Sequence, residues 1–283
     1  ALILSRLNHQ VILLERSNLA APLVRGFYRG GLHYETGFHY AGGLAQGQVL
    51  HRYLDRLGLF KAGLKTRPLA EPGGETLRFS DADFQIPGRY QDFREMMPKR
   101  PELDSFFDRS FSFFKKSPFL NPEGGLEAGD IYRAGPSLAE ALDSLPLTGR
   151  WKNIIGFRSL LYGLAPSEAS FGEFALVNVP YLSGGHSFEG GGALLAKAFE
   201  ESARSSGVEL LLGREVTALK TTADNRIRAV EIEANNLRDE LVADCCVYTG
   251  SQAALPRLLP DKALRPVLAR RLASIAETPR PLM

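Results

Sequence analysis

The order of apolar and polar residues predicts alternating helices and strands at the start of the chain. Residues 1–7 have a helix-forming composition that ends near Asn8, and residues 10–15 (QVILLE) form an apolar run without alternation. Such a run is typical of a parallel strand that is covered on both faces. A helix, a short turn and a buried strand indicate the second half of a βαβ unit. The predicted strand ends on an acid, Glu15.

The last third of the chain has the clearest pattern. Residues 184–207 combine a glycine-rich turn with an amphipathic helix that stops at Gly207. Four strands are predicted after it, at 208–212, 215–222, 226–234 and 239–248, with turns at 223–225 and at Asn235-Asn236. The alternation in residues 226–234 (RIRAVEIEA) is typical of a half-buried strand, so a β-meander is expected.

The middle of the chain combines glycines, short strands and further helices. Seven glycines fall within residues 26–47, so the backbone there is expected to come close to another group. Residues 70–100 indicate short strands and loops. Helices are expected at about 49–59, at 101–116, at 137–145 and at 149–164.

Composition narrows the class of protein. Of the 283 residues, 44% are apolar and 23% are charged, as in ordinary globular proteins. The net charge of +2 argues against a nucleic-acid partner, and no apolar run is long enough to span a membrane. The adjacent Cys245 and Cys246 are read as small apolar residues of a buried strand. Because neighbouring cysteines rarely pair and cannot form a four-ligand metal site, we predict no metal and a reducing, cytoplasmic location.

The position of Glu15 indicates a cofactor. In dinucleotide-binding folds, an acid at the end of the second strand accepts hydrogen bonds from ribose hydroxyls, roughly 20 residues after a glycine loop. Counting back that far from Glu15 passes Ala1, so the chain is expected to begin inside the first helix of such a fold. The alternative is that Glu15 simply ends a strand at the surface.

Five segments together resemble the flavin-dependent phytoene desaturase family, which includes carotenoid isomerases and retinol-saturase-like enzymes. The resemblance extends from residue 1 to about 260 and is weakest between 60 and 120. Each segment by itself matches the family only loosely, and it is the order and spacing of all five together that make the resemblance specific. The segments are HQVILLERSN (9–18), GGLHYETGFHYAGGL (30–44), LLYGLAPSEASF (160–171), PYLSGGHSFEGGGALLAKAFEESARSSGVELLLGREVTAL (180–219) and CCVYTGSQAALPRLLP (245–260).

The resemblance implies an α/β fold in which a Rossmann-like, discontinuous FAD-binding domain with a β-meander accompanies an α+β substrate domain. Residues 1–47 and 186–256 would form the FAD-binding domain, and residues 48–185 the substrate domain. Residues 257–283 would begin a further substrate-domain segment. The chain would then be cut at both ends.

The resemblance also assigns roles to single residues. Glu15 would bind the ribose, with Arg16 beside it, and Arg25 would lie near the pyrophosphate. Ala20 and Ala21 stand where the family usually has a glycine pair. Their Cβ atoms occupy space that glycines leave free, which places in doubt a close approach of this backbone to the cofactor. The other assigned positions are Gly37, Gly42 and Gly43 against the flat flavin ring, His39 and Tyr40 near its reacting edge as candidate catalytic residues, and Val216 at the adenine.

The phenylalanine-rich helix at 101–116 has three open interpretations. It could be an ordinary core face, a wall of a tunnel for a long polyene, or a surface that dips into a bilayer through Phe106, Phe107 and Phe111. Lys115 and Lys116 suit anionic headgroups, and they equally suit any helix C-terminus.

The function implied is that of an FAD-dependent oxidoreductase that acts by hydride transfer on an apolar polyene or isoprenoid. Desaturation, saturation and isomerisation stay open, and NAD(P) is an optional electron partner. The expected partners are a small apolar substrate and no nucleic acid, with peripheral membrane contact as an open alternative. The rival functions are a non-catalytic, truncated or decayed binder of apolar ligands and a flavin-dependent amine oxidase.

Overall fold

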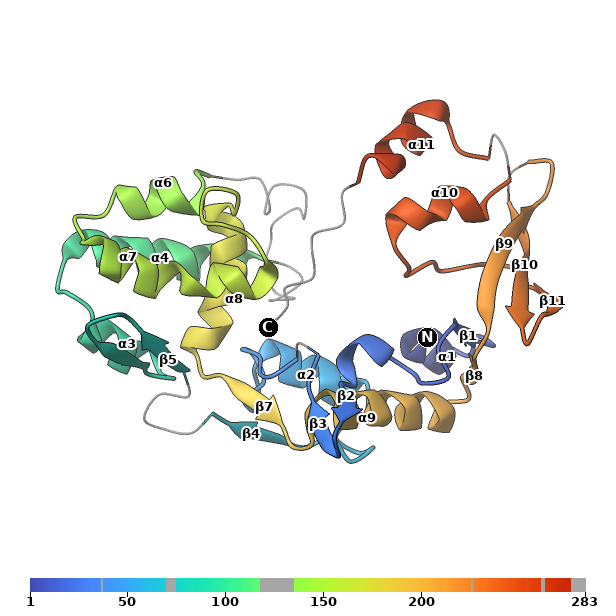
Figure 1. The fold of residues 1–283 in the computed structure, drawn as a ribbon, viewed down its shortest axis with the longest axis horizontal. Helices are drawn as coiled ribbons and strands as arrows, with labels where there is room; N and C mark the ends of the chain where they lie inside the picture. The colour runs from blue at the N-terminus through green and yellow to red at the C-terminus, as the bar shows by residue number, and fades with distance from the viewer. Residues whose placement is uncertain (37, 70–74, 118–134, 225, 261–262, 276–283) are drawn as a thin grey trace. The chain divides into compact units, whose positions relative to one another are not determined.

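The computed structural model describes residues 1–36, 38–69, 75–117, 135–224, 226–260 and 263–275, and the chain divides into two compact units (Figure 1). The first unit combines residues 1–23 with residues 199–279, and the second contains residues 24–198. The boundaries between these units differ from the predicted boundaries between the FAD-binding and substrate domains, which lie at 47/48 and 185/186. Because compactness does not say which residues bind a cofactor, that assignment stays a prediction.

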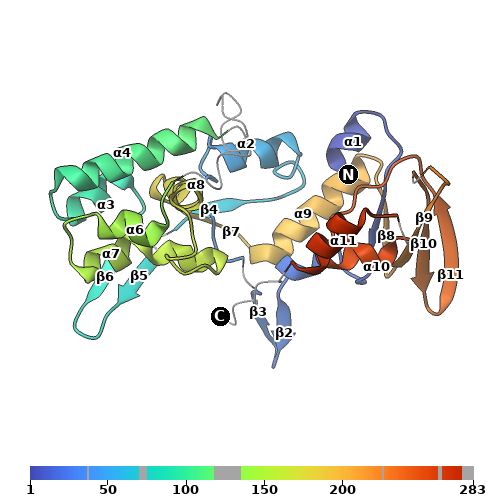
Figure 2. The same cartoon turned by 90° about the horizontal axis from the view of Figure 1, so that it is seen from above.

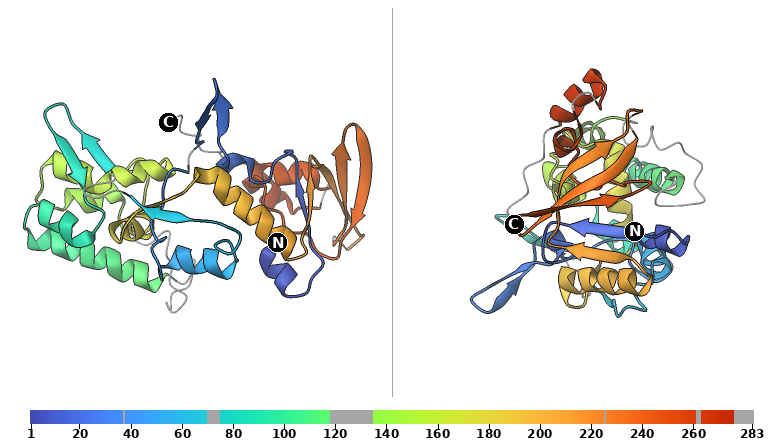
Figure 3. Two further views of the ribbon diagram at one scale, coloured as in Figure 1. Left: turned by 90° about the horizontal axis from the view of Figure 1, so that it is seen from below. Right: turned by 90° about the vertical axis from the view of Figure 1, so that its right-hand side faces the viewer.

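The first unit begins with the predicted helix and strand. Helix α1 (Leu2–Arg6) is followed by Asn8 in the left-handed region at φ 64°, which confirms the predicted stop. Strand β1 (Ile12–Glu15) runs parallel to β8 (Glu209–Leu212) (Figure 3). Their register pairs Glu15 with Leu212. Helix α9 (Gly191–Ser205) precedes β8 along the chain, and the 3-10 turn η1 (Pro22–Val24) follows β1.

The predicted meander forms a three-stranded antiparallel sheet in the order β11-β10-β9. Its strands are β9 (Glu215–Thr221), β10 (Ile227–Ala234) and β11 (Leu237–Val242). Asn235 and Asn236 both have positive φ, at 49° and 61°, as a tight hairpin turn requires. A small core of Leu219, Val230 and Ile232 underlies the sheet. The turn η3 (Gln252–Ala254) and helices α10 (Leu255–Leu258) and α11 (Pro266–Ala273) follow.

The last predicted strand is shorter than expected. In the antiparallel pair of β10 and β11, Val242 lies opposite Ala229, which is only two residues after Ile227, the first residue of β10. The chain beyond Val242 therefore runs past the start of β10, where little strand is left to pair with it. Cys245 is therefore exposed and Cys246 is half-buried, outside any strand. The interpretation of both cysteines as residues of a buried strand was wrong.

Helices pack around the main core of the second unit (Figure 2). They are α3 (Tyr90–Met96), α4 (Pro101–Lys116), α6 (Leu138–Asp143), α7 (Gly149–Gly156), the 3-10 segment η2 (Phe157–Tyr162) and α8 (Phe171–Leu182). Reciprocal capping boxes start two of them, Ser137 with Glu140 in α6 and Ser170 with Glu173 in α8. Sequence patterns missed α8 because it is buried on most sides and therefore lacks an amphipathic period.

The phenylalanine-rich helix is a core helix. Phe106 and Phe107 are 4% and 0% exposed, and Phe106 packs edge-on against Phe171 of α8. These two rings therefore cannot dip into a bilayer, and the ordinary core interpretation is confirmed. Among the described helices, none combines the length and apolar character that a membrane crossing requires. A peripheral membrane contact stays a prediction.

Short strand pairs bring distant segments of the second unit together. The hairpin β2 (Phe27–Arg29) with β3 (Leu32–Tyr34) precedes helix α2 (Val49–Arg56), and β5 (Glu75–Arg78) pairs with β6 (Asp83–Ile86). Strand β4 (Thr66–Pro68) pairs with β7 (His186–Phe188), and His186 also bridges to Ala41. The glycine-rich segment around residue 41 is thereby fixed beside the end of α8.

Candidate functional site

Glu15 lies where the sequence places it, at the carboxyl end of a parallel strand. Its side chain is half-buried, and Oε1 accepts a hydrogen bond of 2.7 Å from the backbone N–H of Ser17. A carboxylate has about four acceptor positions, so capacity for further donors remains. The carboxyl ends of parallel strands are the usual ligand-binding edge of α/β sheets.

Arg16 and Val216 lie in the same unit as Glu15. The backbone carbonyl of Glu15 accepts from the N–H of Arg214 at 2.9 Å, which brings the end of β1 to the start of β9. Val216 is half-buried against the small core and pairs with Ile232. Arg16 lies 3.6 Å from the carboxylate of Glu215, in a pair so exposed that it contributes little stability. The structure therefore brings these three predicted residues together.

The other predicted residues belong to the second unit. Gly37 lies outside the described residues. Arg25 is half-buried, and its carbonyl oxygen is 2.9 Å from Nε2 of His33. His39 is exposed. The roles of Arg25 and His39 toward a cofactor stay predictions.

Gly42 and Gly43 have structural reasons to be glycines that need no cofactor. A Cβ on Gly42 would lie 2.5 Å from backbone atoms of Pro180 and Tyr181, so Gly42 is required by the close approach of α8. Gly43 has φ +79°, a conformation that side-chain-bearing residues rarely adopt. The flavin-facing role predicted for both glycines is therefore not needed to explain them.

The two glycines that begin α9, Gly191 and Gly192, are explained by Glu35, a residue that no sequence pattern singled out. Oε2 of Glu35 accepts from the N–H of Gly192 at 3.2 Å, and this carboxylate lies at the positive end of the α9 dipole. A Cβ on Gly191 would lie 1.8 Å from Oε1 of Glu35, and a Cβ on Gly192 would lie 1.6 Å from the carbonyl oxygen of Val24. The terminus of α9 is thus bound by an anion of its own chain.

Tyr40 belongs to a buried polar network. Its hydroxyl donates to Oε1 of Glu75, and its backbone carbonyl accepts from the hydroxyl of Tyr181 at 3.3 Å. Burial, followed by the hydrogen bond to Glu75, raises the pKa of Tyr40 well above its ordinary value. Tyr40 therefore stays protonated at neutral pH, with its proton directed at Glu75.

Arg158 is the charged centre of this network. Its side chain is only 3% exposed, and Nη2 lies 2.5 Å from Oε2 of Glu75. Nη1 donates to Oδ1 of Asn178 at 2.9 Å, and the guanidinium lies 5.4 Å from the ring centre of Tyr181. Glu75, Arg158 and Asn178 were missed because they are far apart in sequence. The only signal was an arginine inside the otherwise apolar stretch IIGFRSLLYG.

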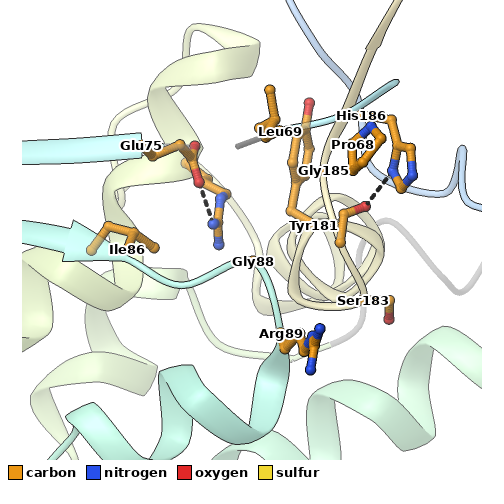
Figure 4. A pocket seen from close by; sticks show the side chains of 12 residues that line it. Pro68, Leu69, Glu75, Ile86, Gly88, Arg89, Tyr181, Ser183, Gly185 and His186 are labelled. Carbon is orange, nitrogen blue, oxygen red and sulfur yellow. Dashed lines mark hydrogen bonds and ion pairs between the residues drawn. The ribbon is translucent and has the colours of Figure 1, made fainter. Parts of the chain in front are cut away.

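The network lines a cavity of about 160 Å³ (Figure 4). Figure 4 shows Glu75 and Tyr181 on its walls, together with the apolar Leu69 and Ile86 and with His186. A second cavity, of about 220 Å³, is almost wholly apolar and lies between α2 and α8. Tyr181 lines both cavities.

A parallel strand that ends on an acid, together with a helix and a β-meander, defines an α/β fold of the dinucleotide-binding kind. The chain matches the family of flavin containing amine oxidoreductases over residues 1–278. It belongs to this family, which confirms the resemblance to flavin-dependent oxidoreductases.

Individual relatives agree with this class. All-trans-retinol 13,14-reductase from Homo sapiens is 23% identical over 291 residues, which cover 93% of this chain and 47% of the human protein. An oxidoreductase from Methanosarcina mazei has a similar fold, with a TM-score of 0.66, 17% identity and coverage of 96% of this chain and 61% of that one. A triple mutant of putrescine oxidase also has a similar fold, with a TM-score of 0.61 and 16% identity. The match covers 95% of this chain and 59% of the putrescine oxidase chain. The chain spans about half the length of the curated relatives that it matches.

The residues present fit the adenosine end of a flavin dinucleotide. Glu15 offers only acceptors, and its carboxylate is held at the strand end by Ser17, as a ligand for a ribose diol requires. The neighbouring β9 supplies main-chain groups beside Val216. Ala21 is compatible with a tight turn at the cost of strain, because it has φ 49° where glycine would be relaxed.

Proposed function

We propose that the intact protein is an FAD-dependent oxidoreductase that moves a hydride between its flavin and a carbon of an apolar polyene or isoprenoid. The supporting observation is the half-buried carboxylate of Glu15 at the end of β1, in a chain of which 93% aligns with a retinol reductase. When bound, the flavin supplies the hydride chemistry, and the protein binds, orients and excludes water.

The direction that we propose is saturation, because the human and rat relatives are both named as 13,14-reductases of all-trans-retinol. Saturation consumes two electrons per double bond, and reduced NAD(P) is the proposed source. Glu15 would accept hydrogen bonds from the ribose hydroxyls. Tyr40, whose hydroxyl proton is held by Glu75, would form a wall of the site rather than donate a proton.

Oxidation of an amine is the second candidate, and the likeness to putrescine oxidase favours it at the level of fold. Tyr40 and Tyr181 meet edge to face, with ring centres 5.4 Å apart, as part of an aromatic cage would. The guanidinium of Arg158 already lies beside the Tyr181 ring, however. A cationic amine would have to approach a buried cation there, so the polyene is the better-supported substrate.

The test compares flavin binding by the purified wild type and by Glu15→Gln. Loss of a charge-assisted hydrogen bond is worth about 1.5–3 kcal/mol, so the FAD dissociation constant should rise by about tenfold to a hundredfold. Quenching of flavin fluorescence on titration gives the constants. Glu209→Gln is the matched control and should bind FAD as the wild type does, because Glu209 is exposed and lies at the opposite end of the β1–β8 ladder from Glu15.

An equal dissociation constant for Glu15→Gln and the wild type would remove Glu15 from the ribose site. Failure of every form to bind FAD, including the complete gene product, would favour the non-catalytic binder. If FAD binds, anaerobic bleaching or recovery of the flavin absorption band with all-trans-retinol and with putrescine then decides between polyene and amine.

A further inference from the structure

The hairpin formed by β2 and β3 exposes a concentration of large apolar side chains. Phe27, Tyr28, Leu32 and Tyr34 are between 44% and 76% exposed, and they fall within eight consecutive residues. Single exposed apolar residues are normal on a protein surface, whereas a contiguous group of them marks an interaction site. Figure 2 shows the hairpin extending away from the helices of the second unit. The hairpin is therefore a candidate contact surface.

One face of the hairpin combines aromatic rings, an aliphatic side chain and a cation. The register places Phe27 opposite Tyr34 and Arg29 opposite Leu32. Side chains directly opposite each other, and those two residues apart along a strand, lie on the same face of a sheet. The rings of Phe27 and Tyr34 stack with their centres 5.4 Å apart. These four residues form the hairpin face.

The charge of the hairpin is positive. Between residues 25 and 34 the sequence contains two arginines, Arg25 and Arg29, and no acid. Arg29 is exposed and lies immediately before the turn. The first acid after the hairpin is Glu35, whose half-buried carboxylate accepts from the N–H of Gly192 at the start of α9. An anionic partner would therefore be attracted to the hairpin face and would meet no like charge from the hairpin itself.

The turn of the hairpin is open on all sides. It consists of Gly30 and Gly31, both with positive φ, and a Cβ on either would meet nothing within 4 Å. A protein partner would need a groove that matches this tip, whereas a layer of lipid headgroups adapts to its shape. Aromatic and arginine side chains are typical of the region between lipid headgroups and hydrocarbon.

The backbone of the hairpin sets how deeply it can enter a membrane. Among the described residues, β2 and β3 pair only with each other, so the outer edge of each strand has no partner strand. Hydrocarbon cannot satisfy the backbone N–H and C=O groups of a free strand edge. The hairpin can therefore enter the headgroup layer and not the core of a bilayer.

A second hairpin shows that exposed apolar residues alone do not define such a surface. The β10–β11 hairpin also exposes Leu237 and Val242, with Arg238 beside the turn. Its two strands contain four acids and two arginines, and Arg238 lies 3.1 Å from the carboxylate of Glu233. This hairpin has a net negative charge, so an anionic surface would repel it. It offers a control of similar architecture.

We propose that the hairpin face docks the protein onto an anionic lipid membrane at the depth of the headgroups. Phe106 and Phe107 of α4, which the sequence offered for a membrane contact, are buried, whereas the hairpin face is exposed. This inference goes beyond the proposed function and does not rest on it, because docking requires neither a flavin nor a polyene.

Co-sedimentation with vesicles tests the proposal on the purified protein. Vesicles that contain phosphatidylserine should bind it more tightly than vesicles of phosphatidylcholine alone, and salt should weaken this binding because it screens exposed charges. Arg29→Gln should lower the partition coefficient about fivefold, the effect of one basic residue near an anionic surface. Leu32→Ser should lower it about tenfold, because the aliphatic side chain no longer leaves water.

Two double variants separate the hairpin face from a general effect of charge. Arg29→Gln with Leu32→Ser should bind vesicles at least about tenfold more weakly than the wild type. Arg238→Gln with Leu237→Ser makes the same chemical changes in the β10–β11 hairpin and should bind as the wild type does. Equal binding by the two double variants would overturn the proposal. So would equal binding of the wild type to both kinds of vesicle, or binding to neither.

The depth of the hairpin can be read from an added tryptophan in Leu32→Trp. Trp151 of α7 is the single tryptophan of the wild type, which therefore supplies the background signal. Lipids brominated close to the headgroup should quench the added tryptophan more strongly than lipids brominated at the chain ends. Strongest quenching from the chain ends would contradict the headgroup depth. A vesicle-bound protein without any added quenching would contradict the hairpin as the contact.

Analytical ultracentrifugation examines the other occupant that an exposed apolar face could have, a second copy of the chain. The wild type and the variant Arg29→Gln with Leu32→Ser should sediment alike in the absence of vesicles. A wild type that dimerises, when this variant is monomeric, would show that a second copy covers the hairpin face and would overturn the proposal. Because no step of these tests involves FAD or turnover, their failure leaves the proposed function untouched.

Discussion

The strand end at Glu15 and the network around Arg158 are built in opposite ways. Glu15 is half-buried and bonded within two residues of its own position, whereas Arg158 is almost fully buried and bonded to partners 83 and 20 residues away. A local arrangement tolerates change in its surroundings, because few other groups depend on it. A buried network does not, since each member satisfies another.

The largest effect should follow from separating the buried ion pair. Arg158→Met leaves Glu75 nearly buried without its cation and should lower the free energy of unfolding by about 3–5 kcal/mol. Chemical denaturation followed by circular dichroism measures it. Adding Glu75→Gln should restore much of the loss, because replacing a whole buried pair by neutral groups is often nearly neutral. A stable single variant would show that the two regions do not differ as described.

An intermediate effect is expected at Gly42. The Cβ of Gly42→Ala would lie 2.5 Å from backbone atoms of α8, which cannot move as a flexible side chain can. Overpacking of this kind costs about 1–3 kcal/mol, readable as a lower midpoint in thermal unfolding. Gly149→Ala, where a Cβ meets nothing, should unfold at the wild-type midpoint or slightly above it. Identical behaviour of the two variants would contradict the close approach of α8.

A smaller effect, visible mainly at alkaline pH, is expected at Tyr162. Burial raises the pKa of Tyr162 to about 12 from its ordinary value of 10.0. The folded state therefore holds this proton after the unfolded state has lost it, so stability is full below pH 10 and falls as the pH rises through about 12. Tyr162→Phe should flatten this fall. At neutral pH it should change stability by no more than about 1 kcal/mol, because the hydroxyl has no hydrogen-bond partner among the described residues.

The smallest effect belongs to the strand-end region. Ala21 has φ 49°, so Ala21→Gly relieves backbone strain and should raise the free energy of unfolding by less than about 1 kcal/mol. Ala20→Gly is the control, because Ala20 does not have a positive φ and should lose stability slightly. An equal loss of stability in Ala21→Gly and in the control would mean that chain entropy, and not strain, governs this turn.

How far the sequence predicts each region follows from the same contrast. The apolar run before Glu15, the Asn235-Asn236 turn and the face of α4 that carries Phe107 are local patterns, and each appears in the structure. Helix α8 was missed because a helix buried on most sides has no period. The Tyr40 network was missed because Glu75, Arg158 and Asn178 meet only through tertiary packing, which no short window of sequence contains.

The two glycines that begin α9 limit how the sequence can diverge. A Cβ at Gly192 would lie 1.6 Å from the carbonyl oxygen of Val24, so alanine at this position requires the backbone near residue 24 to move. A Cβ at Gly191 would lie 1.8 Å from Oε1 of Glu35, and Gly191 has φ +63°, so alanine there requires the Glu35 side chain to turn away and leaves the backbone strained. The residues that the start of α9 tolerates are therefore set by two segments that are distant along the chain.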